Sequence, residues 1–320
     1  MMKKPLRSAA LLLLGLAAGS GAVNAGYLLT PGEAGSQFLT MPISARSVAL
    51  GSGLSGVAGD IHAFEYNPAA TATLEDNQLT FTRSVLFQGS DLTSFAIGLQ
   101  PIKSVSFALQ YRRFGSSDKE RDMSGYDLER EVDISDNGLS FGMSRMFMKR
   151  FSVGYNAEYL RRNLHEHSAN TVNHNVGVQW HFNKRHVLGF SAQNIGRSIQ
   201  FLEQHEPMPI VFRVGGSHKF KMMSNAESEP NLMGVWELNQ FRDSQHPGGS
   251  AGAEWQMVDF FILRAGLQYR EDARPTAGIG LRWQYFQLDY GILSRSEAGI
   301  AHTVSVMVRW DSIDGMDLGD

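Results

Sequence analysis

One glycine-rich segment has a spacing that could bind a nucleotide. Gly51-Ser52-Gly53-Leu54-Ser55-Gly56 fits the pattern G-x-G-x-x-G, and Glu75 lies nearly at the distance expected for a ribose-binding acid. Such a loop needs a strand before it and a helix after it, because the helix N-terminus receives the pyrophosphate. The surrounding residues show no such unit. We therefore interpret the segment as a glycine-rich turn that packs closely against the rest of the protein, and we predict no cofactor.

A serine motif raises the possibility of a hydrolase. Gly138-Leu139-Ser140-Phe141-Gly142 fits G-x-S-x-G, which forms a nucleophile elbow when it stands at a sharp strand-to-helix turn. Here bulky and small residues simply continue to alternate, so we expect Ser140 to be an ordinary strand residue. We predict no catalytic residue, and an esterase remains an alternative that inhibitor labelling of Ser140 would reveal.

Three histidines lie close together in the sequence. His165, His167 and His174 could supply imidazole ligands to a transition metal. They stand around a connection between two expected strands, where nothing fixes their geometry. We therefore expect solvated side chains and no metal site.

The N-terminus and the composition place the protein outside the cytoplasm. Residues 1–25 combine Lys3, Lys4 and Arg7, an apolar stretch, and Val23-Asn24-Ala25, which predicts a signal peptide cleaved after Ala25. The 320 residues contain no cysteine, and 19% are charged, which excludes disulfide-stapled and disordered classes. Without the signal peptide the net charge becomes −6, so no basic surface for nucleic acid is expected.

From residue 78 onward the sequence alternates with a period of two, which is typical of antiparallel strands with one apolar and one polar face. Turn signals divide the chain into fourteen strands: 78–87, 91–100, 104–114, 136–147, 150–162, 170–182, 185–194, 210–220, 231–240, 249–257, 260–270, 275–283, 285–293 and 301–310. Beyond the signal peptide no apolar run is long enough for a transmembrane helix. The pattern predicts an all-β transmembrane antiparallel barrel of about fourteen strands, with a soluble β-sandwich as the alternative.

Loop lengths and tryptophans support the barrel. Short turns follow most even strands, whereas longer segments such as 115–135, 195–209, 241–248 and 294–300 follow odd strands. Outer-membrane barrels have short periplasmic turns and long extracellular loops. Four tryptophans stand on the apolar face near the short-turn ends, where we predict a periplasmic aromatic girdle. These are Trp180, Trp255, Trp283 and Trp310.

Charged residues on the polar face are expected to point into the lumen. They are Glu158, Arg213, Glu254, Arg264, Arg282, Asp289 and Arg309. Their mixed signs predict ion pairs across the barrel and to a plug. Residues 26–77 lack alternation and are rich in small residues, and a fourteen-stranded barrel has more interior than its own side chains fill. We therefore expect 26–77 to form a hatch inside the barrel (78–310), followed by an acidic tail (311–320).

The hatch sequence resembles a known family. The resemblance begins with Ser36-Gln37-Phe38-Leu39 and includes the segment 44–51 with Arg46 and Gly51, then Asp60 and Asn67-Pro68-Ala69. It continues at 191–196, 209–215, 252–254, 263–266, 288–290 and His302. In this order the pieces are similar to the PorV/PorQ family, relatives of the FadL-type outer-membrane transporters. The resemblance implies a fourteen-stranded barrel with a hatch in the lumen, in the outer membrane of a diderm bacterium.

The resemblance also implies partners. PorV-like proteins act in type IX secretion, where they receive exported cargo proteins and pass them to secretion and attachment machinery. This gives our main hypothesis, with residues 115–135 and 195–209 as expected docking surfaces. The second hypothesis is a FadL-like conduit for hydrophobic small molecules. An enzyme and a purely structural barrel are further alternatives, and contact with outer-membrane lipid is expected in every case.

Overall fold

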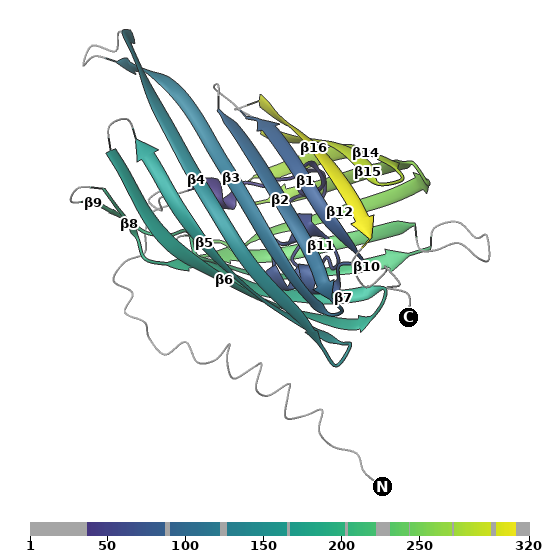
Figure 1. The fold of residues 1–320 in the computed structure, drawn as a ribbon. Helices are drawn as coiled ribbons and strands as arrows, with labels where there is room; N and C mark the ends of the chain where they lie inside the picture. Colours follow the sequence, from purple (N-terminus) through teal and green to yellow (C-terminus); the bar gives the residue numbers. More distant parts are fainter. Residues whose placement is uncertain are drawn as a thin grey trace.

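A computed structural model describes residues 37–86, 90–121, 127–164, 167–201, 204–221, 231–242, 244–270, 272–295 and 299–311. The chain forms a closed antiparallel barrel of fourteen strands (Figure 1). The barrel strands are β1 (Asp76–Val85), β2 (Asp91–Ile102), β3 (Val105–Arg121), β4 (Asp127–Phe147), β5 (Phe151–Leu164), β6 (His167–Asn183), β7 (His186–Gly196), β10 (Val211–Phe220), β11 (Leu232–Phe241), β12 (Gly248–Val258), β13 (Phe261–Tyr269), β14 (Ala273–Trp283), β15 (Phe286–Arg295) and β16 (Gly299–Asp311). The predicted fold and number of strands are confirmed.

Each barrel strand pairs with the strands before and after it, and β1 pairs with β16 to close the ring. Phe81 of β1, for example, lies opposite both Phe95 of β2 and Val306 of β16. Closure leaves no unpaired strand edge, which a membrane-spanning sheet requires because lipid offers no hydrogen bonds.

Two regions that we expected to be loops contain strands. Within 115–135, β3 and β4 continue as a paired hairpin to Arg121 and Asp127, and this hairpin extends past its neighbours (Figure 1). Within 195–209, β8 (Ile199–Phe201) pairs with β9 (Gln204–Glu206). Once a hairpin leaves the membrane both faces meet water, so the alternation that revealed the other strands is lost although the backbone pairing continues.

Side chains alternate between the two surfaces of the barrel. In β5, Tyr155 and Tyr159 are exposed on the outside, whereas Asn156 and Glu158 are buried toward the lumen. Ser140 of β4 is buried on the lumen side and Phe141 is exposed outside, so the G-x-S-x-G segment lies within a strand. An apolar outer surface and a polar inner surface are typical of a barrel that is surrounded by lipid and has a polar lumen.

The four tryptophans of the predicted girdle lie near the short-turn ends of β6, β12, β14 and β16. Trp283 is 78% exposed and Trp180 38%, while Trp255 and Trp310 are half-buried. The position of these rings at the periplasmic interface stays a prediction.

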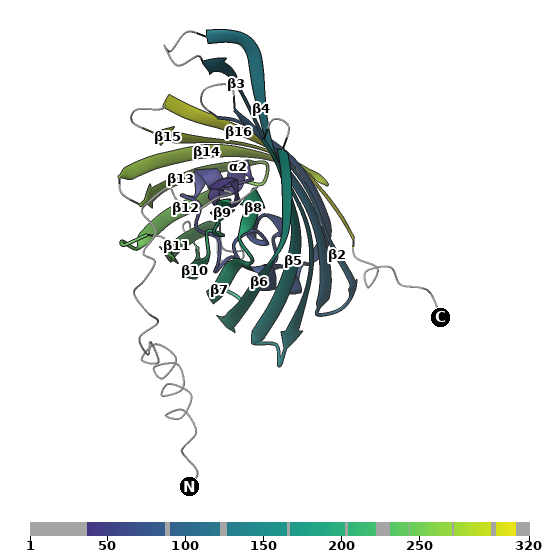
Figure 2. The same cartoon turned by 90° about the vertical axis from the view of Figure 1, so that its left-hand side faces the viewer.

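The described residues before β1, 37–75, lie inside the barrel (Figure 2). They form four short helical turns: η1 (Gln37–Thr40), α2 (Ala45–Ala49), η2 (Ile61–Ala63) and η3 (Pro68–Thr73). Side chains of Ser44, Asp60 and Asn67 cap three of these turns by accepting hydrogen bonds from backbone amides. None of the described helices is long and apolar enough to cross a membrane. The predicted signal peptide, residues 26–36 and the tail after Asp311 lie outside the described residues.

Candidate functional site

The hatch meets the barrel wall along ten inward-facing glycines, which we call the glycine belt. Its members are Gly98, Gly142, Gly154, Gly177, Gly189, Gly215, Gly252, Gly266, Gly278 and Gly291. A Cβ on Gly252 would lie 2.6 Å from the backbone oxygen of Leu50, and one on Gly291 would lie 2.5 Å from that of Ala45. Real Cβ atoms do not approach so closely, so the hatch backbone occupies space that any larger residue would need.

The hatch has little regular secondary structure, so side chains of the wall supply hydrogen bonds to its backbone carbonyl groups. Gln179 Nε2 donates to the carbonyl oxygens of Ser55 (3.0 Å) and Val57 (2.8 Å). Ser217 Oγ donates to the carbonyl oxygen of Gly56 at 2.7 Å, and Thr276 Oγ1 donates to that of Ala49 at 3.0 Å. Buried backbone groups need such partners. The small polar residues on the inner face therefore act as the hydrogen-bonding shell of the hatch.

Asn67 is the most connected side chain of the hatch motif. Its Oδ1 accepts from the amide of Ala69 at 3.0 Å and so caps η3, which Pro68 begins. Its Nδ2 lies 3.0 Å from the carbonyl oxygen of Ser55 and 3.1 Å from that of Val178 on β6. One fully buried amide thus joins two hatch segments to the wall.

An ion-pair chain links the hatch to three wall strands. Arg46 of α2 pairs with Asp60 of the hatch and, through two nitrogens at 2.7 and 2.8 Å, with Glu254 of β12. Arg264 of β13 donates to Glu254 (2.7 Å) and to Asp289 of β15 (2.7 Å). Bidentate guanidinium–carboxylate pairs are strong and directional. The charges fix where α2 lies against the wall.

Two more residues of the predicted lumen set lie beside this chain. Arg282 Nε and Arg309 Nη2 each lie 3.2 Å from Gln287 Oε1, and Gln287 Nε2 donates to Asp289 at 2.7 Å. All seven lumen-facing charges that the alternation predicts point inward, and Glu254, Arg264, Asp289, Arg282 and Arg309 form one connected group.

The remaining two lumen charges pair with residues that the sequence did not single out. Arg112 of β3 donates to both oxygens of Glu158 at 2.7 Å, and Arg213 donates to Glu237 of β11 at 2.6 Å. Glu237 also accepts from the amide of Ser55 at 3.0 Å. Both Arg112 and Glu237 stand at lumen-facing positions, which the alternation could have found.

Two titratable hatch groups are held in their neutral forms. Burial lowers the pKa of His62 to about 3, and the positive charge of Arg46 acts in the same direction. Burial raises the pKa of Glu65 to about 8, against the opposing effect of Arg112. Glu65 Oε2 accepts from the amide of Ile43 at 3.2 Å. An uncharged side chain tolerates such burial better than a charged one.

The first hatch residues that the structure describes, Gln37–Pro42, form what we call the outer end, which lies toward the long-loop side. Phe38 and Leu39 are buried in an apolar cluster together with Leu160, Ala169, Ile199 and Met208. Ile199 belongs to β8, and Glu206 of β9 pairs with Arg162 of the wall. The β8–β9 hairpin therefore packs against the outer end and is held to the wall by an ion pair.

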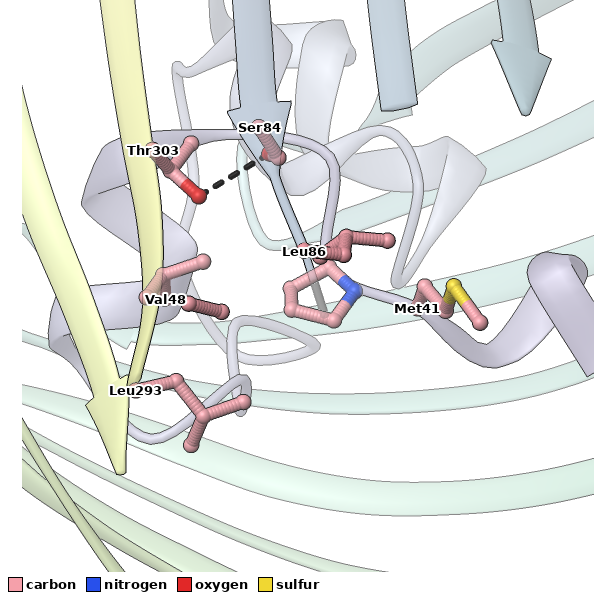
Figure 3. A pocket seen from close by; sticks show the side chains of 8 residues that line it. Met41, Val48, Ser84, Leu86, Leu293 and Thr303 are labelled. Carbon is pink, nitrogen blue, oxygen red and sulfur yellow. Dashed lines mark hydrogen bonds between the residues drawn. The ribbon is translucent and has the colours of Figure 1, made fainter. Parts of the chain in front are cut away.

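Two small cavities border the outer end. Figure 3 shows the apolar one, which lies between hatch residues Met41 and Val48 and wall residues Leu293 and Thr303. It holds about 20 Å³ of free space. The second holds about 10 Å³ and is polar, with Glu65 and Arg112 in its lining. Each is little larger than a water molecule needs, and far smaller than a ligand site.

The glycine-rich segment lies in the hatch, and the two described histidines of the candidate metal site lie at exposed positions. Residues 51–56 form a turn of the hatch beside wall strands, and Gly51 has a positive φ of 76° that suits glycine. His174 stacks on Tyr155 and bonds to its hydroxyl (2.7 Å) on the outer surface, His167 is exposed, and His165 lies outside the described residues. Within the described ranges no three His, Asp or Glu side chains gather as a metal site would.

Solved structures with the same architecture include two that are described as toluene transporters. The P. putida toluene transporter TodX matches with a TM-score of 0.62 at 11% identity, over 84% of this chain and 98% of that one. The Ralstonia pickettii toluene transporter TbuX gives 0.59 at 12% (83% and 98%), and a Pseudomonas aeruginosa FadL homologue gives 0.56 at 12% (84% and 98%). The sequence matches no family model and no curated protein, and nothing favours the PorV/PorQ family in particular. At these identities the likeness establishes that the chain has the fold of these transporters.

Proposed function

We propose that the protein is an outer-membrane barrel, exported with a cleaved signal peptide, that takes up small hydrophobic molecules at its extracellular side. The observation that carries this proposal is the apolar cluster around Phe38 and Leu39, where hatch, wall and the β8–β9 hairpin meet. The solved neighbours TodX and TbuX are described as toluene transporters. An apolar ligand would replace the apolar contacts of the outer end at little cost.

The cavities are too small for a ligand while the outer end is in place. Uptake therefore requires the outer end to leave its cluster, and Phe38 and Leu39 then act as occupants that a ligand displaces. In the hatch body below, apolar side chains such as Leu50 and Leu54 are already fully buried in a cluster with the wall, so they are not open to a ligand. Entry at the outer end is thus the step that selects for hydrophobic molecules.

Filling the cluster tests the proposal. Ala169 is 7% exposed and faces the cluster, so Ala169→Phe would occupy the space that a ligand needs. Ala253→Phe adds the same bulk at an exposed position on the outer surface. We expect uptake of toluene into proteoliposomes to fall at least about tenfold in A169F, because overpacking blocks the site, and to be unchanged in A253F. Equal uptake by both variants, or no uptake by the unmodified protein, would refute the proposal.

A second candidate function is docking of an exported protein, as the PorV/PorQ resemblance implies. It is favoured by the β3–β4 hairpin, which extends past its neighbours (Figure 1). Affinity capture from detergent-solubilised outer membranes would test it. Co-purified secretion subunits, or cargo with a shared C-terminal domain, that disappear when residues 117–131 are deleted would support docking. Recovery of lipid alone would count against it.

A further inference from the structure

Two neighbouring hairpin turns on the short-turn side carry four exposed cations, which we call the basic tips. The turn between β4 and β5 contributes Lys149 and Arg150, and the turn between β6 and β7 contributes Lys184 and Arg185. In the part of the chain that the structure describes, no carboxylate forms an ion pair with any of the four. The basic tips therefore have positive charge available for an external partner.

The backbone holds the two tips side by side. The amide of His181 donates to the carbonyl oxygen of Arg150 at 2.7 Å, so the first turn contacts the strand that leads into the second. Successive tips along a barrel rim are about 10 Å apart, twice the spacing of adjacent strands. The four cations can therefore act on one ligand.

Four aromatic side chains, the aromatic row, lie on the outer surface directly next to the basic tips. Phe147 lies opposite Phe151, which in turn lies opposite Trp180. Phe151 and Trp180 stack with ring centroids 5.9 Å apart, and Trp180 and Phe182 are 4.1 Å apart. All four rings are between 38% and 50% exposed. Outward-facing rings at a strand end are typical of the level where acyl chains meet lipid headgroups.

The first turn also has a strained backbone. Met148 and Lys149 both have positive φ, 51° and 54°, in a region where turns normally place Gly, Asn or Asp. Met148 is 88% exposed, so packing does not explain its presence. Ser104 and Gln284 in two other short turns also have positive φ, so this backbone belongs to the tight hairpin turn, and the exposed side chain of Lys149 is accessible to a ligand there.

From these observations we propose that the basic tips and the aromatic row form a binding site for an anionic phospholipid. The cations hold the phosphodiester, and the rings contact the glycerol and the first part of the acyl chains. A lipid fits this site better than a periplasmic protein does, because the aromatic row lies on the outer surface of the barrel, where acyl chains would contact it. Of the other short turns, the one between β2 and β3 has a single cation, Lys103, and those between β12 and β13 and between β14 and β15 have Asp259 and Gln284, so the positive charge is concentrated at the two turns.

The test measures which lipid stays bound. The mature protein is purified in detergent containing equal amounts of phosphatidylglycerol and phosphatidylethanolamine, and retained lipid is counted by native mass spectrometry. We expect the unmodified protein to prefer phosphatidylglycerol at least about tenfold, since each cation near an anionic headgroup contributes about fivefold. The variant in which all four cations of the basic tips are replaced by glutamine should lose this preference. Its substitutions are K149Q, R150Q, K184Q and R185Q.

The matched control removes four exposed cations from the opposite rim and should keep the preference. Its substitutions are R113Q, R161Q, R197Q and R242Q.

A second variant keeps the proposal falsifiable if the fourfold change impairs folding. M148N combined with K149G gives the turn residues that its backbone prefers, so the barrel should unfold at a higher temperature while phosphatidylglycerol retention falls about fivefold. Two results would overturn the proposal: equal retention of the two lipids by the unmodified protein, or an unchanged preference for phosphatidylglycerol in both tip variants.

Discussion

The hatch has two parts that are held by different forces. The body, from Ile43 onward, packs in apolar clusters of its own and is in addition fixed by the ion-pair chain of Arg46, the glycine belt and hydrogen bonds from the wall. The outer end is held by the burial of Phe38 and Leu39 in an apolar cluster. Removing one partner of a buried ion pair or of a close-packed contact costs much free energy, whereas the apolar contacts of one group can be replaced by those of another. From this contrast we expect the body to keep the lumen closed, and the outer end to exchange its apolar contacts for those of a ligand.

Removing the central charge of the body should have the largest effect. In Arg46→Met the buried carboxylate of Asp60 loses its ion pair, and Glu254 keeps only Arg264. Breaking a buried pair costs about 3–5 kcal/mol. We expect a lower unfolding temperature on heat-modifiability gels and larger conductance in planar bilayers as the hatch loosens.

The control for this variant is Arg83→Met. Arg83 pairs with Asp91 at 3.8 Å with a side chain that is 64% exposed, so its loss should change little. Matching behaviour of the two variants would show that the ion-pair chain does not hold the hatch.

A smaller effect is expected from one methyl group on the glycine belt. In Gly252→Ala the new Cβ would lie 2.6 Å from the Leu50 carbonyl oxygen, so hatch or wall must move. Overpacking of this kind costs about 1–3 kcal/mol. Gly234→Ala is the control on the neighbouring strand, where the nearest atom would be 3.7 Å away. Equal unfolding temperatures of the two variants would contradict a tight seal at the belt.

The sequence predicted the barrel well because the membrane imposes its pattern residue by residue. Lipid outside and a polar lumen inside force the alternation seen in β5, and each reversal of the chain adds a turn signal. Glu158 and Asp289, which the same alternation assigns to the lumen, are fully buried. Strand ends were predicted less well, as β3 and β4 show, because the pattern disappears where both faces meet water.

The contacts of the hatch could not be predicted in the same way. The motif from Arg46 to Ala69 indicated that the hatch matters, but its partners come from strands more than a hundred residues away, as Asn67 and Val178 illustrate. The glycine belt was visible as glycines on the polar face, yet nothing local relates Gly252 to Leu50. Such pairings depend on how an irregular segment settles in a closed lumen.

Glu65 lies at the boundary of the two hatch regions, and its replacement should have the smallest effect near pH 5. It lines the polar cavity beside Leu39 of the outer end, and its carboxyl accepts from Ile43 of the body. Burial raises its pKa from 4.5 to about 8, so the folded protein holds a proton there that the unfolded chain releases. Stability should therefore fall as pH rises between these two values.

Glu65→Gln keeps the hydrogen-bond acceptor for Ile43 but cannot ionise, so its unfolding temperature should be close to that of the unmodified protein near pH 5 and exceed it by a margin that grows up to about pH 8. Glu75→Gln, at an exposed position, corrects for the loss of a carboxylate and should leave the pH dependence unchanged. Because ionisation of Glu65 places a buried charge where the outer end meets the body, toluene uptake in the unmodified protein should also rise with pH relative to E65Q. Parallel stability curves for the unmodified protein and E65Q would mean that this boundary does not titrate, and that the outer end and the body are not coupled through Glu65.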